Sequence, residues 1–414
     1  MSTKLQKYKL GELIDVRRGA SLAGEYYATE GELVRLTLGH FDYQDGGFKD
    51  NTSKDNLYFT GPIKPEFILN KGDIITPLTE QTPGLLGSTA MIPESGKYIQ
   101  SQDVALITPD ETKLDRNFCY YLLPSKIVKQ QLAAGAQQTK IRHTTPDRIK
   151  DLTVFIPDLS NQKTIGQLLR DIDRKIALNR EINRNLEAMA RQLYDYWFVQ
   201  FDFPDENGRP YKSSGGKMIW NEKLKHEIPY GWEVAAIGDI LDKYPTTKRF
   251  DTSEYLNEGL HPIIDQGDSY IVGFTNETVN VLHKYPAVLF GDHSTRVKFI
   301  DFPFGRGADG TQILYSKSSK ISQWYLYLFV SSLSIPNPGY SRHFKYLKEM
   351  LIIVPSQAVT DEFSKVIEPV FTEWTSQIFE VIQLSKQRDE LLPLLMNGQV
   401  SVMQPEVNCD LSHD

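Results

Sequence analysis

Two stretches of this chain match the spacing of motifs that perform chemistry in other proteins. Residues 305–310 satisfy G-x-G-x-x-G, which binds a dinucleotide pyrophosphate when a helix follows it. Residues 311–315 instead have the pattern of a strand, so no helix N-terminus would face the phosphates. Pro157 and Asp158, with residues 173–175 further along, match the spacing of a PD-(D/E)-x-K nuclease. Residues 173–175 fall on a predicted helix, and we expect them to form its solvated face rather than a catalytic site.

The chain also lacks the motifs that methyl transfer and ATP-driven movement would need. It contains no Asn/Asp-Pro-Pro-Tyr/Phe loop, which an adenine methyltransferase uses to hold a flipped base. Gly215-Gly216-Lys217 lacks both the upstream glycine and the following hydroxyl residue of a P-loop. The sequence therefore predicts a protein that is not catalytic by itself. A stand-alone enzyme with an unfamiliar site is the alternative.

Composition favours a globular protein of a reducing compartment. Of the 414 residues, 40% are hydrophobic and 24% are charged, which is enough for two or three cores. Cys119 and Cys409 are the only cysteines, so neither a disulfide framework nor a zinc-type spacing is expected. The chain opens without the apolar stretch of a signal peptide and has no run of about 18 apolar residues. We therefore expect a cytoplasmic protein without a membrane span.

The net charge of −7 argues mildly against nucleic-acid binding, since phosphate contacts are usually made by an excess of Lys and Arg. The charges are unevenly distributed. Residues 140–148 and 342–348 are locally basic, while the helical stretches and the C-terminal tail carry many carboxylates. Because the field at a surface follows local charge, these basic loops matter more than the sum.

An internal repeat organises the chain. Residues 149–157 read IKDLTVFIP and residues 347–355 read LKEMLIIVP, 198 positions later. A shorter pair, LGEL at 10–13 and IGDI at 237–240, occurs near the start of each half. Each copy of the longer segment is followed at once by a helical pattern. The sequence therefore predicts a globular region and a long helix, present twice in tandem.

We predict the α+β class, with two tandem mixed α/β regions joined by two long helices. Strands are expected at residues 34–38, 73–76 and 104–108, and again at 287–290, 296–300 and 311–315, with helices at 116–131 and 322–331. The predicted boundaries are residues 1–157 for the first globular region, 158–198 for the first long helix, 199–229 for a linker, 230–355 for the second globular region, 356–400 for the second long helix and 401–414 for an acidic tail that we expect to be disordered.

Both long helices carry an apolar stripe at the three-four spacing that is typical of a coiled-coil seam. The stripes coincide after a shift of 198 residues, and Asn179 and Gln377 interrupt them at equivalent positions. A buried amide in a seam fixes register at some cost in stability. We therefore expect an antiparallel coiled coil and an internal pseudo-two-fold repeat. The predicted seam residues are Ile165, Leu169, Ile172, Ile176, Asn179, Leu186, Leu193, Phe363, Ile367, Val370, Trp374, Gln377, Leu384 and Leu391.

This two-fold pattern resembles the specificity subunit of type I restriction-modification systems. The most specific part is the linker, which reads WFVQFDFPDENGRPYKSSGGKMIW and then IPYGW. The resemblance covers about residues 5–400. It implies that each globular region is a target-recognition domain for one half of a bipartite DNA sequence. It further implies that the helices set the spacing and dock the methylation subunits, and that catalysis belongs to the partners.

The resemblance also implies partners and cofactors. We expect the chain to bind double-stranded DNA, two methylation subunits and restriction-translocation subunits. S-adenosylmethionine is expected in the methylation subunits and ATP with Mg in the restriction subunits, with no cofactor or metal in this chain. A complex that methylates without cutting, and a scaffold that binds proteins through paired modules, are the alternatives.

The predicted DNA contacts are basic and amide side chains in loops of each half. Arg and Gln can form paired hydrogen bonds with guanine and adenine edges, while Lys mostly contacts phosphate. The loop that begins at Gly135 is about six residues longer than the one at Gly339, so we predict an asymmetric target. The alternative is that these are ordinary surface charges. The candidates are Gln137, Gln138, Lys140, Arg142, His143, Arg296, Lys298, Arg306, Arg342, His343 and Lys345.

An aromatic cluster lies where the first long helix ends. Such a cluster either docks a partner, because aromatic residues dominate interface hot spots, or forms a small core that fastens the linker to the helices. The sequence leaves both interpretations open. Its members are Tyr194, Tyr196, Trp197, Phe198, Phe201 and Phe203.

Overall fold

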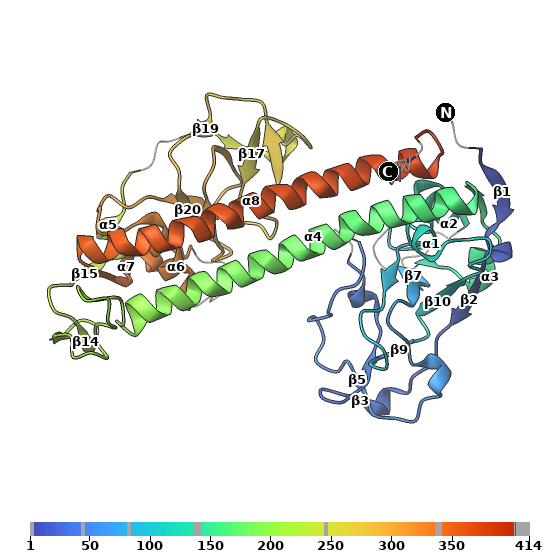
Figure 1. The fold of residues 1–414 in the computed structure, drawn as a ribbon, viewed down its shortest axis with the longest axis horizontal. Helices are drawn as coiled ribbons and strands as arrows, with labels where there is room; N and C mark the ends of the chain where they lie inside the picture. Colours follow the sequence, from blue (N-terminus) through green and yellow to red (C-terminus); the bar gives the residue numbers. More distant parts are fainter. Residues whose placement is uncertain are drawn as a thin grey trace, which may run out of the picture. The chain divides into compact units, whose positions relative to one another are not determined.

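The computed structural model of the chain describes residues 4–42, 46–80, 84–135, 142–243, 247–335, 342–400 and 402. These residues form a mixed α/β protein. The chain divides into two compact units: unit 1 comprises Met1–Ala177 and Ile382–Asp414, and unit 2 comprises Leu178–Val381. The division passes through both long helices, so each unit holds a globular part and a portion of each helix (Figure 1).

The main sheet of unit 1 has four antiparallel strands in the order β2-β10-β6-β8. A second four-stranded sheet has the order β3-β5-β4-β9, and β1 pairs with β12 as β7 pairs with β11. The predicted strand at 34–38 is shorter than expected, because a 3-10 helix begins at Leu38. The strands are β1 (Gln6–Lys9), β2 (Ile14–Arg18), β3 (Tyr27–Ala28), β4 (Val34–Arg35), β5 (Tyr58–Phe59), β6 (Ile74–Pro77), β7 (Thr79–Glu80), β8 (Ala90–Met91), β9 (Tyr98–Ile99), β10 (Val104–Pro109), β11 (Arg142–His143) and β12 (Thr153–Ile156).

Three short helices complete the globular part of unit 1. The single helix predicted over residues 116–131 is wrong, because two helices flank Pro124. Proline lacks the backbone N–H and its ring clashes with the preceding turn, so the first helix stops there. The three helices are α1 (Arg116–Leu122), α2 (Lys126–Gly135) and α3 (Pro146–Lys150).

Unit 2 is built from several small sheets. Strand β20 is central in a three-stranded sheet, β21-β20-β23, and all five of its residues are buried. A further sheet has the order β16-β22-β17-β18, with β19 also on β22, while β15 pairs with β24 and β13 with β14. The G-x-G-x-x-G segment forms the end of β22 and the turn into β23, which confirms the expected strand after it. The strands are β13 (Met218–Asn221), β14 (His226–Pro229), β15 (Glu233–Ala236), β16 (Arg249–Phe250), β17 (His261–Ile264), β18 (Gly273–Thr275), β19 (Val281–Leu282), β20 (Ala287–Gly291), β21 (Val297–Ile300), β22 (Phe304–Gly307), β23 (Thr311–Leu314) and β24 (Leu351–Val354), and the short helices are α5 (Ile237–Ile240), α6 (Gln323–Ser332) and α7 (Phe344–Glu349).

The aromatic cluster at the end of the first long helix lies in the core of unit 2. The ring centroid of Phe198 lies 4.4 Å from that of Tyr325 and 4.8 Å from that of Phe363. Phe203 stacks on Trp232 with centroids 5.0 Å apart. These contacts favour the core interpretation over a docking surface. Tyr194, Trp197 and Phe201 are also buried, while Tyr196 is exposed.

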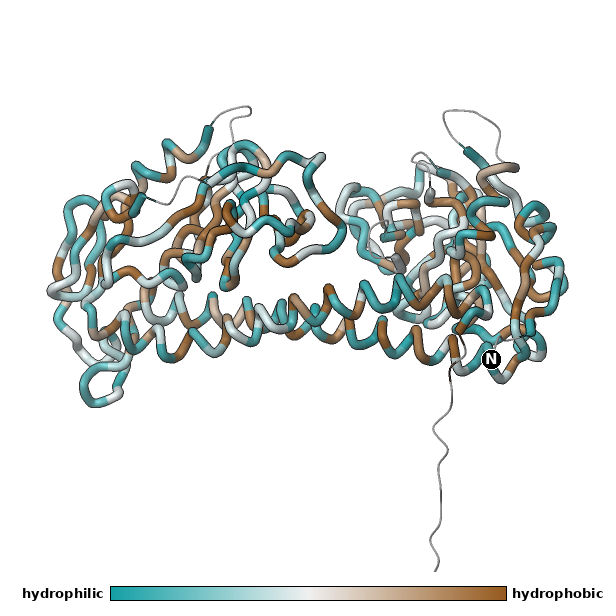
Figure 2. Tube along the Cα trace, turned by 90° about the horizontal axis from the view of Figure 1, so that it is seen from above, coloured by the Kyte–Doolittle hydropathy of each residue, from teal (hydrophilic) through white to brown (hydrophobic). Residues whose placement is uncertain are grey.

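The two long helices are α4 (Leu159–Tyr194) and α8 (Gln357–Met396), and a π-helical turn follows α4. Hydrophobic and hydrophilic residues alternate along both (Figure 2). In unit 2, the Nδ2 of Asn179 on α4 donates to Glu380 on α8 at 2.7 Å. Further along α4, Ala190 lies with Phe371 of α8 around a small apolar cavity. Residue numbers rise in one helix as they fall in the other, so the portions in unit 2 run in opposite directions.

In unit 1 the same two helices meet through a partly buried polar group. Asp173 on α4 accepts a hydrogen bond from the hydroxyl of Tyr121 on α1 and pairs with Arg388 on α8 at 3.0 Å. The prediction that Asp173 belongs to a solvated helix face is therefore wrong. The sequence periodicity identified its helix correctly, but the partners come from two distant segments.

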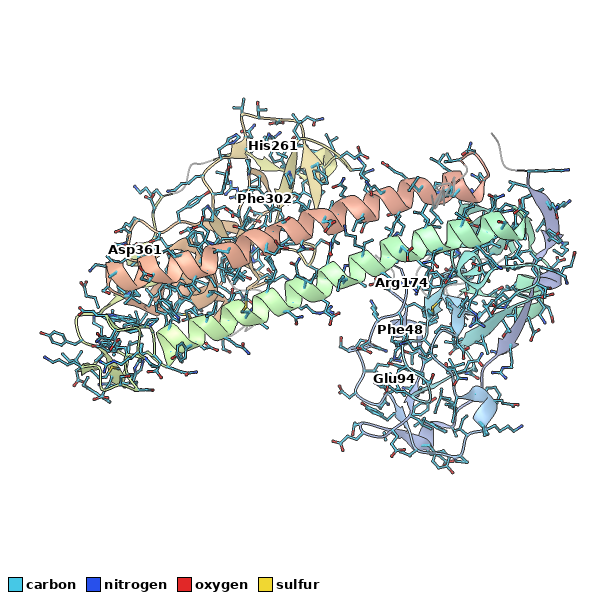
Figure 3. All side chains as sticks on the ribbon, in the orientation of Figure 1. Phe48, Glu94, Arg174, His261, Phe302 and Asp361 are labelled. Carbon is cyan, nitrogen blue, oxygen red and sulfur yellow. The ribbon has the colours of Figure 1, made fainter. Side chains whose placement is uncertain are left out.

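Every predicted seam residue is buried or half-buried. Several of them contact the globular parts as well as the other helix. Ile165 and Leu169 belong to the core of unit 1 with Phe118, and Phe363 belongs to the core of unit 2. Phe302, in the bend between β21 and β22 and labelled in Figure 3, packs edge-on against Phe379 of α8 with ring centroids 4.8 Å apart. The apolar stripes therefore fasten the helices to the sheets.

The polar interruptions of the two stripes behave differently. Asn179 is buried and bonds across to α8, whereas Gln377 donates to Glu373 on its own helix at 2.6 Å. The Oε1 atom of Gln377 is buried and has no hydrogen-bond partner among the described residues. Equivalent positions in the sequence therefore have different polar environments.

The sequence repeat has a local structural counterpart in each unit. In unit 1, β1 pairs antiparallel with β12, and in unit 2, β15 pairs antiparallel with β24. The N–H of Leu10 donates to Leu152 O at 2.8 Å, and the N–H of Ile237 donates to Met350 O at 2.8 Å. The two copies of the sequence repeat therefore form equivalent strand pairs, and the same backbone hydrogen bond follows the first strand of each pair. No helix among the described residues is long and apolar enough to cross a membrane.

Candidate nucleic-acid interface

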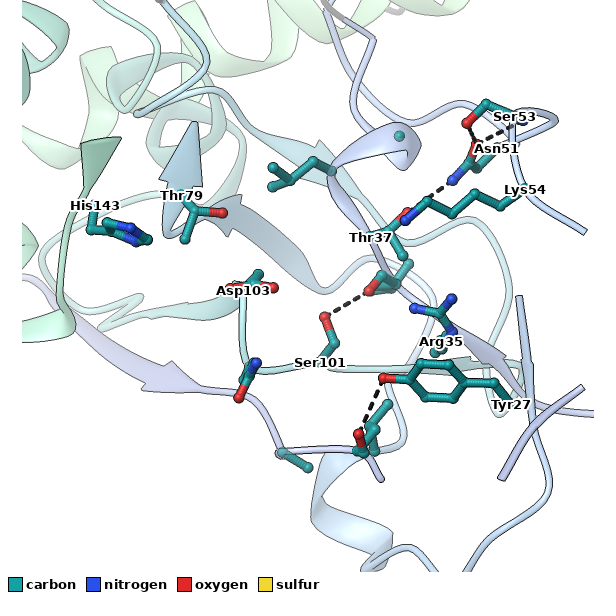
Figure 4. Close-up of a pocket in the computed structure, with 16 residues that line it drawn as sticks. Tyr27, Arg35, Thr37, Asn51, Ser53, Lys54, Thr79, Ser101, Asp103 and His143 are labelled. Atoms are coloured by element: carbon teal, nitrogen blue, oxygen red, sulfur yellow. Dashed lines mark hydrogen bonds between the residues drawn. The ribbon is translucent and has the colours of Figure 1, made fainter. Parts of the chain in front are cut away.

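A polar pocket of about 470 Å³ opens on unit 1 (Figure 4). Its walls come from β4, β7 and β11, from the segment that precedes β10, and from the loop around residues 51–54. Figure 4 shows His143, Thr79 and Asp103 on one side of the pocket and Arg35 with Tyr27 on the other. The polar side chains that line it belong to Tyr27, Arg35, Thr37, Asn51, Ser53, Lys54, Thr79, Ser101, Gln102, Asp103 and His143.

Arg35 brings a fixed positive charge to one wall of this pocket. Its guanidinium lies 3.8 Å from the ring centroid of Tyr27, and its Nε and Nη2 donate to Asn56 O at 3.1 and 3.0 Å. The side chain is 8% exposed. A guanidinium that is stacked and hydrogen-bonded in this way loses little further entropy when it meets an anion. Arg35 is therefore suited to an electrostatic role towards a phosphate.

The loop beside Arg35 is held by short polar contacts. Asn51 Nδ2 donates to Thr37 Oγ1 at 2.9 Å, and Ser53 Oγ donates to Asn51 Oδ1 at 2.6 Å. Gly39 leaves room for this packing, because a Cβ there would lie 2.5 to 2.8 Å from the side chain of Asn51. Burial lowers the pKa of His40, which lies behind the loop, so its ring is neutral at neutral pH. The exposed Lys54 follows this ordered segment.

The opposite wall rests on three backbone segments that are tied together. The N–H of Leu78, just after β6, donates to Asp103 O at 2.8 Å, and the N–H of Thr144, just before α3, donates to Leu78 O at 2.8 Å. We call these linked segments the three-segment frame. Thr79, Gln102 and His143 are the chain neighbours of its bonded residues, and all three line the pocket.

A buried carboxylate reinforces this frame in unit 1. Glu80 is 3% exposed, and its Oε2 accepts from the N–H groups of Gly84 and Leu86 at 3.0 and 2.9 Å. Its Oε1 pairs with Nη1 of Arg142 at 3.4 Å. Arg142 therefore compensates a buried charge, although part of its side chain reaches solvent.

Unit 2 contains the same three-segment frame. The N–H of Asp292, just after β20, donates to Gly310 O at 2.8 Å, and the N–H of His343, just before α7, donates to Asp292 O at 2.9 Å. The corresponding chain neighbours are His293, Asp309 and Arg342, and all three are exposed. Both units thus present three side chains from one backbone arrangement, with different residue types.

In unit 2 the amide of Gln266 stiffens the frame. Its Nε2 donates to Asp309 O at 2.6 Å, and its Oε1 accepts from the N–H of His293 at 3.0 Å. Gly310 has a φ of +80°, and a Cβ there would lie 2.6 Å from His293 and 2.7 Å from Gln266. Glycine is favoured at this position, because other residues rarely adopt this backbone conformation and a Cβ would have to displace the side chains of His293 and Gln266.

The structure separates the predicted DNA contacts into groups. Arg142, His143, Arg342 and Lys345 reach the surface beside the frames. Arg296 is exposed and forms an ion pair with Asp268. Gln137, Gln138 and Lys140 lie outside the described residues.

Three candidates do not lie on the surface, so the premise on which they were chosen is wrong. Lys298 is 7% exposed, donates to Ser269 O at 2.6 Å, and burial lowers its pKa to about 8. Arg306 is 4% exposed and its Nη2 donates to Thr247 O at 2.9 Å. The ring of His343 has no exposed surface. These side chains face inward because strands β21 and β22 and the start of α7 are covered by other segments.

The sequence did not point to Arg35, Tyr27, Thr79, Gln102 or His293. Thr79 and His293 come two positions after a buried strand, Ile74–Pro77 and Ala287–Gly291, which is a signal that the sequence contains. Gln102 and Arg35 carry no comparable signal, because their position depends on strands that pair across the sheet.

Comparison with known proteins gives one family and several relatives. Residues 3–188 match a family described as type I restriction modification DNA specificity domain. The chain is 23% identical over 312 residues to the type I restriction enzyme MjaIX specificity subunit of Methanocaldococcus jannaschii, with 69% of each chain covered. It is 23% identical over 422 residues to the HindI specificity subunit of Haemophilus influenzae, covering 82% of this chain and 89% of that one.

A solved structure shares the fold. It is the type I restriction-modification system S subunit from M. genitalium, with a TM-score of 0.61 and 18% identity. The match covers 95% of this chain and 96% of that chain. At this identity the match supports the fold alone.

Proposed function

We propose that this chain, which belongs with the specificity subunits of type I restriction-modification systems through its specificity domain at residues 3–188, reads a bipartite, asymmetric DNA target. In this proposal each unit contacts one half of the target. The globular part of unit 1 reads one half and that of unit 2 reads the other.

The observation that carries the proposal is the repeated three-segment frame. The two frames have matching backbone hydrogen bonds of 2.8 and 2.8 Å in unit 1 and 2.8 and 2.9 Å in unit 2. The chain neighbours of the bonded residues differ, with Thr79, Gln102 and His143 in one frame and His293, Asp309 and Arg342 in the other, and all of these except the half-buried Thr79 are exposed. A protein that reads two different half-sites with one kind of module needs this combination of a constant backbone and variable side chains.

The long helices would serve as the spacer. Residues 159–194 of α4 and 357–396 of α8 each form an uninterrupted helix of the structure. We propose that they pair as an antiparallel coiled coil with a pseudo-two-fold relation, and that this pair sets the distance between half-sites. The bond from the buried amide of Asn179 to Glu380 supports a fixed register, because a slip of one turn would take this acceptor away from a buried polar group.

The same helices would dock two methylation subunits, since a roughly two-fold chain can hold two identical partners. S-adenosylmethionine would then bind in those subunits, and ATP with Mg in restriction-translocation subunits that join the complex. This chain would contribute recognition and no catalytic residue. Because the net charge is −7, contacts with phosphate would have to come from local cations such as Arg35 and Lys54.

Modified-base sequencing of the host genome, with the gene intact and deleted, tests this function. The expected result is a split, asymmetric adenine-methylation motif that disappears on deletion and returns with a plasmid copy. A motif that persists after deletion would refute the proposal. Methylation of DNA by the purified chain alone would instead favour a stand-alone enzyme.

A further inference from the structure

We infer that three side chains in each unit determine which bases are read: Thr79, Gln102 and His143 for one half-site, and His293, Asp309 and Arg342 for the other. This inference rests on the proposed DNA-reading function and names the residues that would carry it. It places the specificity-determining residues at the three-segment frames rather than throughout the basic loops predicted from the sequence.

The first step is the equivalence of the positions. In each frame the N–H of the residue after a buried strand donates to the carbonyl group of the residue just before the strand that pairs with it in the sheet. This bond is 2.8 Å long in both units. A second N–H, at the entrance to the repeated helix, donates back at 2.8 Å in unit 1 and 2.9 Å in unit 2. Thr79 therefore corresponds to His293, Gln102 to Asp309, and His143 to Arg342.

The second step is that the backbone is rigid while four of the six side chains are available; the carboxylate of Asp309 is paired with Arg249, and Thr79 is half-buried. Glu80 holds the frame of unit 1 through two N–H groups, and Gln266 holds that of unit 2 through Asp309 O and His293 N. Gln102, His143, His293 and Arg342 are exposed, and their side chains form no hydrogen bond with other described residues. A side chain that reads bases needs both features. A rigid backbone keeps the entropy cost of binding low, and polar atoms without a hydrogen bond inside the protein can bond to the DNA.

The third step is the chemistry of each set. The amide of Gln102 can pair with the N6 and N7 atoms of adenine, and the methyl of Thr79 can contact the thymine methyl. The guanidinium of Arg342 can pair with O6 and N7 of guanine, and a carboxylate such as that of Asp309 can accept from N4 of cytosine. We therefore assign an A·T pair to the contacted position of the unit 1 half-site and a G·C pair to that of the unit 2 half-site.

Arg35 and Lys54 have a different role in this assignment. They line the unit 1 pocket on the side away from Thr79 and His143 (Figure 4). Arg35 is already committed to Asn56 O and to the ring of Tyr27. Their charges would bind phosphate and so affect affinity without changing the sequence that is read.

The experiment uses the full complex of this chain with its methylation subunits, and reads the methylated motif by sequencing modified bases in a random-sequence DNA library. Gln102→Ala is expected to lower selectivity at one A·T position of one half-site by about tenfold to hundredfold, the size of one good paired contact. Arg342→Ala is expected to do the same at a G·C position of the other half-site. Each variant is the control for the other, because its second half-site should keep wild-type selectivity.

Three further variants serve as controls, and the first of them covers the possibility that truncation disturbs folding. Gln102→Glu keeps the size of the side chain and exchanges its donor group for an acceptor, so the preference should move from adenine towards cytosine. Gln6→Ala changes an exposed Gln on β1, outside the frame, and should leave both half-sites unaltered. Arg35→Ala should weaken methylation of all sequences alike.

The outcomes separate this inference from the proposed function. If the wild-type complex methylates a bipartite motif and Gln102→Ala, Gln102→Glu and Arg342→Ala leave its selectivity unchanged, the inference is wrong and the function stands. If both half-sites relax in every variant, the assignment of one frame to one half-site is wrong. If the wild-type complex shows no sequence preference, the proposed function itself fails.

Discussion

The two units hold the long helices together in opposite ways at equivalent positions. In unit 1 the contact is between Asp173 of α4 and Arg388 of α8. Adding the repeat distance of 198 to 173 gives Phe371, and subtracting it from 388 gives Ala190. Phe371 and Ala190 lie in the core of unit 2 and line one small cavity. The contact between α4 and α8 at these repeat-related positions is therefore a charge pair in unit 1 and an apolar contact in unit 2. We call this contact the helix junction.

The polar version depends on three segments. Arg388 and Asp173 are 16% and 21% exposed in their side chains. Burial disfavours the charged form of Arg388, yet the hydrogen bond and charge of Asp173 raise its pKa. Burial, and then the neighbouring Asp173, raise the pKa of Tyr121 far above its usual range. Tyr121 therefore stays protonated at neutral pH and can donate to Asp173.

The apolar version depends on aromatic packing. The ring centroid of Phe371 lies 4.5 Å from that of Phe299 and 5.5 Å from that of Tyr327. Ala190 is 1% exposed. Apolar burial is stabilising but tolerant of register, whereas a buried ion pair adds little net stability and penalises every misaligned pairing. The comparison predicts that the charge pair of unit 1, like the bond from Asn179 to Glu380, contributes mainly to the alignment of the helices, and that the apolar contact of unit 2 contributes mainly to stability.

Removing the apolar contact should have the largest effect. Phe371→Ala should lower the free energy of unfolding of unit 2 by about 3 to 5 kcal/mol, because it leaves a cavity among buried rings. All five tryptophans, at positions 197, 220, 232, 324 and 374, lie in unit 2, so tryptophan fluorescence during urea unfolding reports on this unit. A loss below about 1 kcal/mol would contradict the assignment of stability to unit 2.

Breaking the charge pair should have the next largest effect, and in unit 1. Asp173→Ala leaves Arg388 and the hydroxyl of Tyr121 without their partner, which should cost about 2 to 4 kcal/mol. Hydrogen exchange of the unit 1 strands should speed up while the tryptophan transition of unit 2 keeps its midpoint. Asp171→Ala, at an exposed position two residues earlier on the same helix, is the matched control and should have little effect.

Lys298 is a buried charge whose counter-ion lies beyond hydrogen-bond distance, so it should behave differently from the charge pair in unit 1. The Nζ of Lys298 lies 4.0 Å from Asp265, and burial lowers its pKa from 10.5 to about 8. Between these values the unfolded chain binds more protons than the folded one, so stability should rise as the pH increases from 8 to 10.5. Lys298→Met should therefore be more stable than the wild type at pH 7 by about 1 to 2 kcal/mol.

The advantage of Lys298→Met should shrink as the pH approaches 10.5. Tryptophan fluorescence at several pH values measures it. Equal stability of the two proteins at pH 7 would show that the ammonium is well solvated in the folded protein.

Exchanging one junction for the other should have the smallest effect. Asp173→Phe combined with Arg388→Ala gives unit 1 the residues of unit 2, and should cost about 1 kcal/mol, because no charge is left unpaired and only the hydroxyl of Tyr121 loses its acceptor. The single substitutions should each be far more harmful than the pair. Additive losses of stability in a double-mutant cycle would mean that residues 173 and 388 do not interact.

If unit 1 specifies alignment, the exchanged protein should lose precision rather than stability. The spacing between the two halves of the methylated motif, read by sequencing, should become less strict in this double variant. An unchanged single spacing would place the register in other contacts, such as that of Asn179 with Glu380.

Much of the fold could be predicted from the sequence because its signals are local. The strands at 104–108 and 287–290 and both long helices follow from periodicity within one segment, and structure places β10, β20, α4 and α8 there. The break between α1 and α2 could also have been predicted from the sequence, because Pro124 interrupts a helix through its own backbone chemistry.

The candidate site was predicted only in part, for a physical reason. Residue type and loop position identified His143 and Arg342, which the structure places at the frames. They also selected His343, Arg306 and Lys298, which other segments cover. Whether a charged side chain is exposed depends on those segments, and no pattern within the loop records it.

The sequence by itself determined the doubled plan of this protein, because a repeat distance and an apolar period are properties of the chain. Only the tertiary structure decided which residues meet. Asp173 finds Tyr121 and Arg388 from segments 52 and 215 residues away, and Leu78 finds Asp103 and Thr144. Such pairings depend on how strands and helices pack, so the same repeat yields a charge pair in one unit, an aromatic contact in the other, and a different set of exposed side chains on each frame.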